Sequence, residues 1–100
     1  MDINVQELKE KFEKEEKFVL IDVRERHEHQ DFNLGGALIP LGEIPRAIPE
    51  LKEDYQDKEI VLYCRSGNRS GIAQELMLRA GFKNVRNLLG GVLAWKERYG

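Results

Sequence analysis

Cysteine is almost absent from this sequence of 100 residues, in which Cys64 stands alone. A single cysteine excludes an intramolecular disulfide, a Cys-x-x-Cys redox pair and a zinc site built from several thiolates. The sequence also lacks a continuous apolar run long enough to span a bilayer, so we expect no membrane partner. Any sulfur chemistry must therefore depend on one thiol.

Net charge is small as well, because 16 Lys and Arg residues are offset by 18 Asp and Glu residues. A formal charge of −2 provides no basic field to gather phosphates, which argues against nucleic acid as the main partner. The opening stretch MDINVQELKEKFEKEEK is too acidic and too interrupted by charge for a signal or transit peptide. We therefore expect a cytoplasmic protein, and the length predicts one domain over residues 1–100.

Short apolar runs alternate with amphipathic stretches along the chain. The runs at residues 18–21 and 60–63 are continuous and rich in β-branched residues, as in strands buried on both faces of a parallel sheet. Parallel neighbours must be joined through crossovers, usually helices. We therefore predict an α/β fold of three layers, with helices flanking a mainly parallel central sheet. Further strands are predicted at 37–39 and 84–88, and helices at 5–14, 71–80 and 92–99.

Capping residues and prolines refine two of the helical stretches. Asn4 and Glu7 have the spacing of a capping box at the start of the helix over 5–14. Pro45 and Pro49 interrupt the near-helical apolar spacing of residues 41–51. We therefore expect short helical pieces there rather than one helix.

The helix over residues 71–80 has the clearest periodicity. Ser70 is predicted to be its N-cap, and Gly81 has the place of a C′ residue. The side chains at helical spacing predict one buried apolar face, formed by Ile72, Ala73, Leu76, Met77 and Ala80.

The segment between the strand at 60–63 and this helix contains the residues that are best suited to chemistry. Cys64 follows the predicted strand immediately, so we expect the segment Cys-Arg-Ser-Gly-Asn-Arg to form a tight loop at a helix N-terminus. Backbone N–H groups of the first helical turn are free there, and the helix dipole adds partial positive charge. The guanidinium groups of two arginines add full charges, so the loop is predicted to bind anions. The predicted binding residues are Arg65, Ser66, Gly67, Asn68 and Arg69.

Cys64 has two interpretations. An ordinary thiol has a pKa of about 8.5 and is only about 3% ionised at neutral pH, but a positively charged loop favours the thiolate. The alternative is a small buried hydrophobe, which is how a lone cysteine usually behaves. Two arginines and a glycine are poor neighbours for a buried apolar thiol, so we interpret Cys64 as a nucleophile.

Four separated segments together resemble the rhodanese (sulfurtransferase) family, and in particular its small single-domain members. The matching segments are LIDVRE at 20–25, GALIP at 36–40, CRSGNRS at 64–70 and GGVLAW at 90–95. The resemblance covers nearly the whole chain. It departs from the family pattern at Asn33, where a histidine is usual, and we expect this change to alter packing rather than to remove chemistry.

The resemblance implies that Cys64 accepts the outer sulfur of a donor such as thiosulfate and becomes a persulfide. The sulfur then passes to an acceptor such as cyanide or a thiol, and a protein acceptor is also compatible with this chemistry. Arg65 and Arg69 would attract the anionic donor, and the loop amides would stabilise the sulfur anion. The resemblance implies neither a metal nor an organic cofactor.

Two alternatives for the function remain open from the sequence. A cysteine-dependent phosphatase also places a thiolate and an arginine around an oxyanion, but its Cys-x5-Arg loop is one residue longer than the loop from Cys64 to Arg69. A persulfide carrier or binding module for a partner protein would use the same Cys64 without fast turnover of small molecules.

Two further groups of polar residues have structural explanations that we prefer. His27 and His29 flank Glu28, but no third metal ligand is evident, so we interpret this stretch as a solvated turn. Asp22 and Arg24 follow a buried strand, and we expect this pair to support the fold rather than to act as an acid or base.

Overall fold

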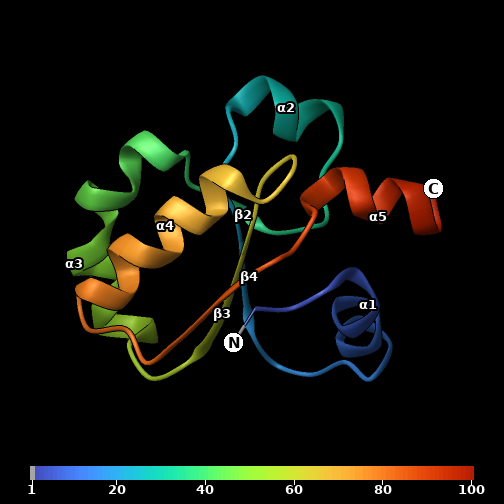
Figure 1. The fold of residues 1–100 in the computed structure, drawn as a ribbon. Coiled ribbons are helices and arrows are strands. Elements are labelled where there is room, and N and C mark those ends of the chain that lie inside the picture. Colours follow the sequence, from blue (N-terminus) through green and yellow to red (C-terminus); the bar gives the residue numbers. More distant parts are fainter. Residues whose placement is uncertain (1) are drawn as a thin grey trace.

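A computed structural model describes residues 2–100 and shows a central sheet between two layers of helices (Figure 1). Helices α3 and α4 cover one face of the sheet, and α1 and α5 cover the other. The elements in chain order are α1 (Val5–Glu13), β1 (Val19–Asp22), α2 (Arg26–Asp31), β2 (Ala37–Leu38), a 3₁₀ helix (Leu41–Glu43), α3 (Ile44–Tyr55), β3 (Glu59–Tyr63), α4 (Asn68–Arg79), β4 (Asn84–Asn87) and α5 (Gly91–Tyr99).

The described strands form one sheet in the order β2-β1-β3-β4, and every neighbouring pair is parallel. The predicted α/β fold with a parallel sheet flanked by helices is therefore confirmed. Because all strands run the same way, their carboxyl ends meet at one edge, where α2 also lies (Figure 1). No helix within residues 2–100 is long and apolar enough to cross a membrane.

The core lies on both faces of β3. Successive side chains of a strand point to opposite faces, so Ile60 and Leu62 pack on the side of α3 and α4, whereas Val61 and Tyr63 pack on the side of α1 and α5. All four side chains are fully buried. The same alternation turns the next residue, Cys64, towards the α4 side.

The start of α1 confirms the predicted capping box. The Glu7 backbone N–H donates to Asn4 Oδ1 at 2.8 Å, and the Asn4 N–H donates to Glu7 Oε1 at 3.2 Å. These two bonds satisfy backbone donors that have no partner within the helix. The helix ends at Glu13, one residue before the predicted end.

The prediction of short helical pieces over residues 41–51 was only partly right. A short 3₁₀ helix covers Leu41–Glu43, but from Ile44 onward α3 is one helix of 12 residues. Pro45 lies in its first turn, where a missing N–H costs no intrahelical bond. Pro49 removes only the bond to the carbonyl of Pro45, one turn further on. Pro45 therefore stands where a helix tolerates proline, whereas Pro49 is an interior proline that costs the helix one hydrogen bond.

Two predictions about α4 were also wrong. The helix begins at Asn68 with Gly67 as its N-cap, so Ser70 is not the cap but a fully buried residue of the first turn. Ile72 is 55% exposed, because the buried stripe runs through Ser70, Ala73 and Met77 and leaves Ile72 roughly a quarter of a turn away.

Candidate active site

The predicted loop connects the carboxyl end of β3 to the amino end of α4. In Figure 1 it is the yellow loop between α2 and the start of α5. Gly67 has φ +104°, a backbone conformation that residues with a side chain rarely adopt. This conformation lets the chain reverse from strand into helix. Cys64 is 1% exposed and lies at the base of the loop.

Three hydrogen-bond donors surround the sulfur of Cys64. The Gly67 N–H donates to Sγ at 3.0 Å, the Ser70 N–H lies at 3.4 Å, and the Ser70 hydroxyl oxygen lies at 3.3 Å. Burial raises the pKa of the Cys64 thiol, but hydrogen bonds from Ser70, Gly67 and Ser66 outweigh burial, so the pKa is lower than its ordinary value. The loop thus favours the ionised sulfur, as expected for a helix N-terminus.

The Ser70 hydroxyl has a second neighbour, since its oxygen lies 2.5 Å from Asn87 Oδ1. The Asn87 amide is oriented by the bond from its Nδ2 to the Gly67 carbonyl, at 3.1 Å. A hydroxyl carries one proton, so Ser70 can donate either to Asn87 Oδ1 or to Cys64 Sγ. Ionisation of the thiol therefore favours donation to Sγ, at the cost of the bond to Asn87.

Ser70→Ala is expected to raise the pH midpoint of Cys64 alkylation, because it removes a donor to the thiolate while keeping the Ser70 backbone N–H. The measurement is the iodoacetamide rate as a function of pH. Ser66→Ala is the matched control, because this exposed serine on the same loop contributes its backbone N–H and not its hydroxyl. Equal midpoints in all three proteins would show that the hydroxyl does not stabilise the thiolate.

Arg69 is held by helix α2. Its two terminal nitrogens donate to the carboxylate oxygens of Glu28 at 2.7 and 2.9 Å, in a bidentate pair that joins α2 to the loop. The hydrogen bonds from Arg69 lower the pKa of Glu28 to about 2. The charge of Arg69 is thus balanced within the protein, and the pair fixes the orientation of its guanidinium.

Glu28→Gln is expected to destabilise the protein by about 1 kcal/mol at neutral pH, because it removes the charge that orients Arg69. The pKa of Glu28 is lower in the folded chain than its ordinary 4.5, so this stability is present above pH 4.5 and is lost as pH falls through about 2. Urea unfolding at several pH values measures the difference.

The control for this prediction is Glu75→Gln, which removes an exposed ion pair with Arg79. Its two side chains are 63% and 76% exposed, so the expected cost is about 0.5 kcal/mol or less. A Glu28→Gln difference that stays constant down to pH 2 would contradict the assignment of the ion pair.

The other predicted loop residues lie at its outer surface. Arg65, Ser66 and Asn68 are exposed, and Asn68 begins α4. Two backbone hydrogen bonds join the amino end of α5 to the start of the loop. The Val92 N–H donates to the Cys64 carbonyl at 2.9 Å, and the Leu93 N–H donates to the Arg65 carbonyl at 3.0 Å. The six predicted residues therefore lie in the loop and the first turn of α4, with the sulfur and its three donors inside.

Asp22 and Arg24 are buried and, with the partly buried His29, form a polar cluster beside this loop. Arg24 donates to Asp22 through Nε at 2.9 Å and through a terminal nitrogen at 2.8 Å, and His29 Nδ1 lies 2.8 Å from Asp22 Oδ2. Burial raises the pKa of Asp22, but these hydrogen bonds outweigh burial and lower it. A carboxylate that is fully buried and occupied by several donors supports the fold, as we expected of this pair.

The interpretation of the histidines as a solvated turn was wrong for His29. A polar stretch predicts exposure, but one turn of α2 places this imidazole against the buried carboxylate of Asp22. Within residues 2–100, no group of three or more His, Cys, Asp or Glu side chains is arranged to hold a metal ion. Asn33 braces the end of the same helix: its Nδ2 donates to the His29 carbonyl, and its Oδ1 accepts from the Gly35 N–H.

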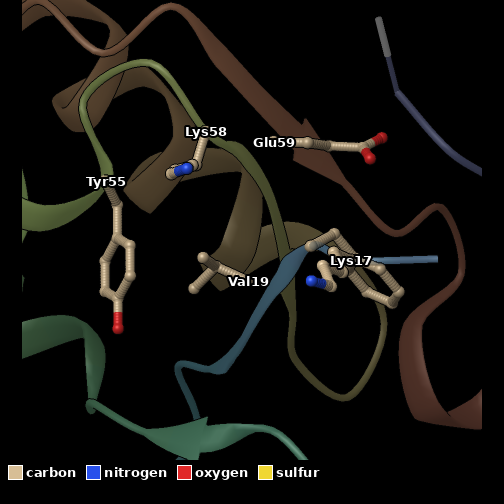
Figure 2. A pocket seen from close by; sticks show the side chains of 6 residues that line it. Lys17, Val19, Tyr55, Lys58 and Glu59 are labelled. Carbon is tan, nitrogen blue, oxygen red and sulfur yellow. The ribbon is translucent and has the colours of Figure 1, made fainter. Parts of the chain in front are cut away.

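A separate hollow of about 220 Å³ lies at the opposite end of the sheet (Figure 2). Val19 and Glu59, the first residues of β1 and β3, line it together with Tyr55 and two lysines, Lys17 and Lys58. Figure 2 shows the Glu59 carboxylate pointing away from the Tyr55 ring, and this carboxylate accepts from Lys11 and Arg86. No thiol lines this hollow, so Cys64 and its loop remain the candidate active site for sulfur chemistry.

The fold and the loop define a class of protein, in which a cysteine follows a central parallel strand and lies within a loop at a helix N-terminus. Comparison with known families agrees with this class, because the Rhodanese family, described as a rhodanese-like domain, matches residues 4–98. The chain therefore belongs to the rhodanese-like domain family.

Its relatives include two proteins of Bacillus subtilis. The chain is 36% identical over 95 residues to a putative sulfur carrier protein, YrkF. The match spans 94% of this chain but only 50% of that protein. It is 41% identical over 96 residues to a putative sulfurtransferase, YtwF, covering 95% of the chain and 89% of the relative. The chain thus spans about half of the first relative and most of the second.

The solved structures give the same result. The human single-domain sulfurtransferase TSTD1 superposes with a TM-score of 0.85 at 25% identity, covering 99% of this chain and 97% of the human one. Membership of this family supports a rhodanese-type role in sulfur transfer.

Proposed function

We propose that the protein is a sulfurtransferase in which Cys64 carries the transferred sulfur. In the first step, the Cys64 thiolate attacks the outer sulfur of thiosulfate and forms a new S–S bond. The bond between that sulfur and the sulfonate group breaks, and sulfite leaves with the bonding electron pair. In the second step, an acceptor such as cyanide attacks the outer sulfur, and the electron pair of the S–S bond returns to Cys64 as the thiolate.

The observation that carries this proposal is the set of three donors around Cys64 Sγ. Double displacement needs a sulfur that is ionised when the donor arrives and that is a good leaving group when the acceptor attacks. A thiol whose pKa is lowered by hydrogen bonds meets both needs. The same amide groups can stabilise the negative charge of the persulfide.

The two arginines have different roles in this proposal. Arg65 is exposed at the loop surface and attracts the anionic donor. Arg69 is fixed by Glu28, so it adds oriented N–H groups and keeps the loop in shape rather than acting as a free charge. Removing Arg65 should therefore mainly weaken donor binding, and removing Arg69 should also disturb the loop.

The direct test is steady-state turnover of thiosulfate with cyanide, compared with hydrolysis of an aryl phosphate. Production of thiocyanate without phosphate release supports the sulfurtransferase. Phosphate release without thiocyanate would overturn it in favour of the phosphatase alternative. The loop favours the first outcome, because only four residues separate Cys64 from Arg69.

A persulfide carrier is the second candidate, and the name of the relative YrkF favours it. A carrier would accept sulfur fully on Cys64 yet turn over small acceptors slowly, because its acceptor is a protein. Stoichiometric persulfide formation with negligible thiocyanate production identifies this case.

A further inference from the structure

A hollow of about 150 Å³ lies beside the active loop, between α2 and the start of α5. Arg65 lines it from the loop, Phe32 from the end of α2, and Leu93 and Lys96 from α5. It also meets the machinery of the site, since Glu28 on its wall holds Arg69 and Val92 on its floor donates to the Cys64 carbonyl. A molecule in this hollow would therefore lie next to the loop that holds the sulfur.

Two of the five charged residues that line the hollow are already paired. Arg24 is bound to Asp22, and Glu28 is bound to Arg69. Arg65 and Lys96 differ, because neither forms an ion pair with a carboxylate within the described residues 2–100, and both side chains are exposed. Asp31 is the one acidic lining residue outside these pairs, so the unpaired charges of the hollow sum to one positive charge.

Lys96 is held in place by an aromatic ring. Its Nζ lies 4.5 Å from the centre of the Phe32 ring, a cation–π contact that holds the ammonium over the hollow. The Phe32 ring and the half-exposed Leu93 side chain give the hollow an apolar wall. The site thus combines two cations with a small apolar surface, at a volume below that of drug-sized pockets.

We infer that this hollow is an acceptor subsite for a low-molecular-weight thiol that carries a carboxylate, whose charge meets Arg65 and Lys96 and whose carbon chain packs on Phe32 and Leu93. This inference rests on the proposed function. Sulfite leaves before the acceptor enters, so Arg65 serves the donor first and the acceptor carboxylate second.

The transfer step balances without any further reactant. The acceptor enters as a neutral thiol and gives its proton to the outer sulfur of the anionic Cys64 persulfide. The resulting acceptor thiolate attacks that sulfur and forms a new S–S bond. The old S–S bond breaks, and its electron pair goes to Cys64 Sγ, which becomes the thiolate again. The acceptor leaves as a protonated persulfide.

Binding to the unloaded protein tests the subsite without requiring any persulfide. The protein is titrated with 3-mercaptopropionate, with neutral 2-mercaptoethanol and with cationic cysteamine, and amide NMR signals are followed. We expect the signals of Phe32, Arg65 and Leu93 to shift to saturation only with 3-mercaptopropionate. Lys96→Glu should weaken this binding about tenfold, because it reverses a charge in contact with the carboxylate. Equal responses to the three thiols, or an unchanged affinity in Lys96→Glu, would overturn the inference.

The control variant is Lys83→Glu, which makes the same change at an exposed lysine outside the hollow. It should bind 3-mercaptopropionate as the parent protein does. A similar loss of affinity in Lys83→Glu and Lys96→Glu would show that only the net charge of the protein matters and would contradict a subsite.

A second measurement uses protein preloaded with thiosulfate and freed of donor, so that only the acceptor step is observed. The ratio of the Lys96→Glu rate to the parent rate, taken for each thiol, cancels the different reactivities of the three thiols. This ratio should fall only for 3-mercaptopropionate. If no persulfide forms, the proposed function fails, while the binding titration still decides whether the subsite exists.

Discussion

Replacing Cys64 by serine is expected to lower thiosulfate:cyanide sulfur transfer by more than about 1,000-fold, because the hydroxyl cannot replace the thiolate as nucleophile or leaving group. The donors from Gly67 and Ser70 can still bond to a serine oxygen at this position. The free energy of unfolding should therefore change by only about 1 kcal/mol. Steady-state kinetics and urea unfolding measure the two effects separately.

Glu75→Gln serves as the activity control, since it changes an exposed side chain of α4 outside the active loop. Its transfer rate should remain within about twofold of the parent rate. Substantial activity in Cys64→Ser would refute the mechanism, whatever the behaviour of the control.

Gly91→Ala is expected to have the largest effect on stability. Gly91 is at φ +57°, and a methyl group there would press on the Cys64 carbonyl oxygen and lie 2.6 Å from the Arg65 carbonyl oxygen. These carbonyls accept hydrogen bonds from the start of α5, so neither side can move without breaking them. We expect a loss of about 3 kcal/mol, which lowers the midpoint of thermal unfolding by more than about 10 °C.

Gly42→Ala is the matched control, because a methyl group at Gly42 would meet no atom within 4 Å. Its unfolding midpoint should stay close to that of the parent, or rise slightly as the unfolded chain loses freedom. Sulfur transfer should fall in Gly91→Ala alone, since the same clash displaces the base of the active loop. Equal thermal midpoints in the two variants would show that α5 does not hold the loop as tightly as the contacts imply.

The sheet and the capping box of α1 were predictable because their signals are local. Continuous apolar runs at β1 and β3 indicate strands buried on both faces, and the Asn4 cap needs only residues within one turn. The active loop was predictable for the same reason, since its cysteine, glycine and arginines are neighbours in the sequence.

Contacts between distant segments were not predictable from the sequence. Glu28 and Arg69 are 41 positions apart, and Asn87 is 17 positions from Ser70, so no spacing rule joins them. In the sequence, Glu28 drew attention only as the residue between His27 and His29, where a metal site was considered and not favoured. The pairing appears once α2 is placed across the carboxyl end of the sheet.

Ser70 shows how a correct residue can be given the wrong role. A serine before an apolar stretch is a good N-cap candidate, but Gly67 can adopt the left-handed conformation that lets the helix begin three residues earlier. The hydroxyl is then buried beside Cys64 rather than at the end of a helix. A prediction from capping preference alone does not include this competition.

The most direct test of the account is the intact mass of the protein after exposure to thiosulfate and removal of the donor, followed by peptide mapping. We expect a gain of one sulfur atom, located on the peptide that contains Cys64 and lost again when cyanide is added. A protein whose mass is unchanged after thiosulfate, although its thiol is free and its fold intact, would contradict it.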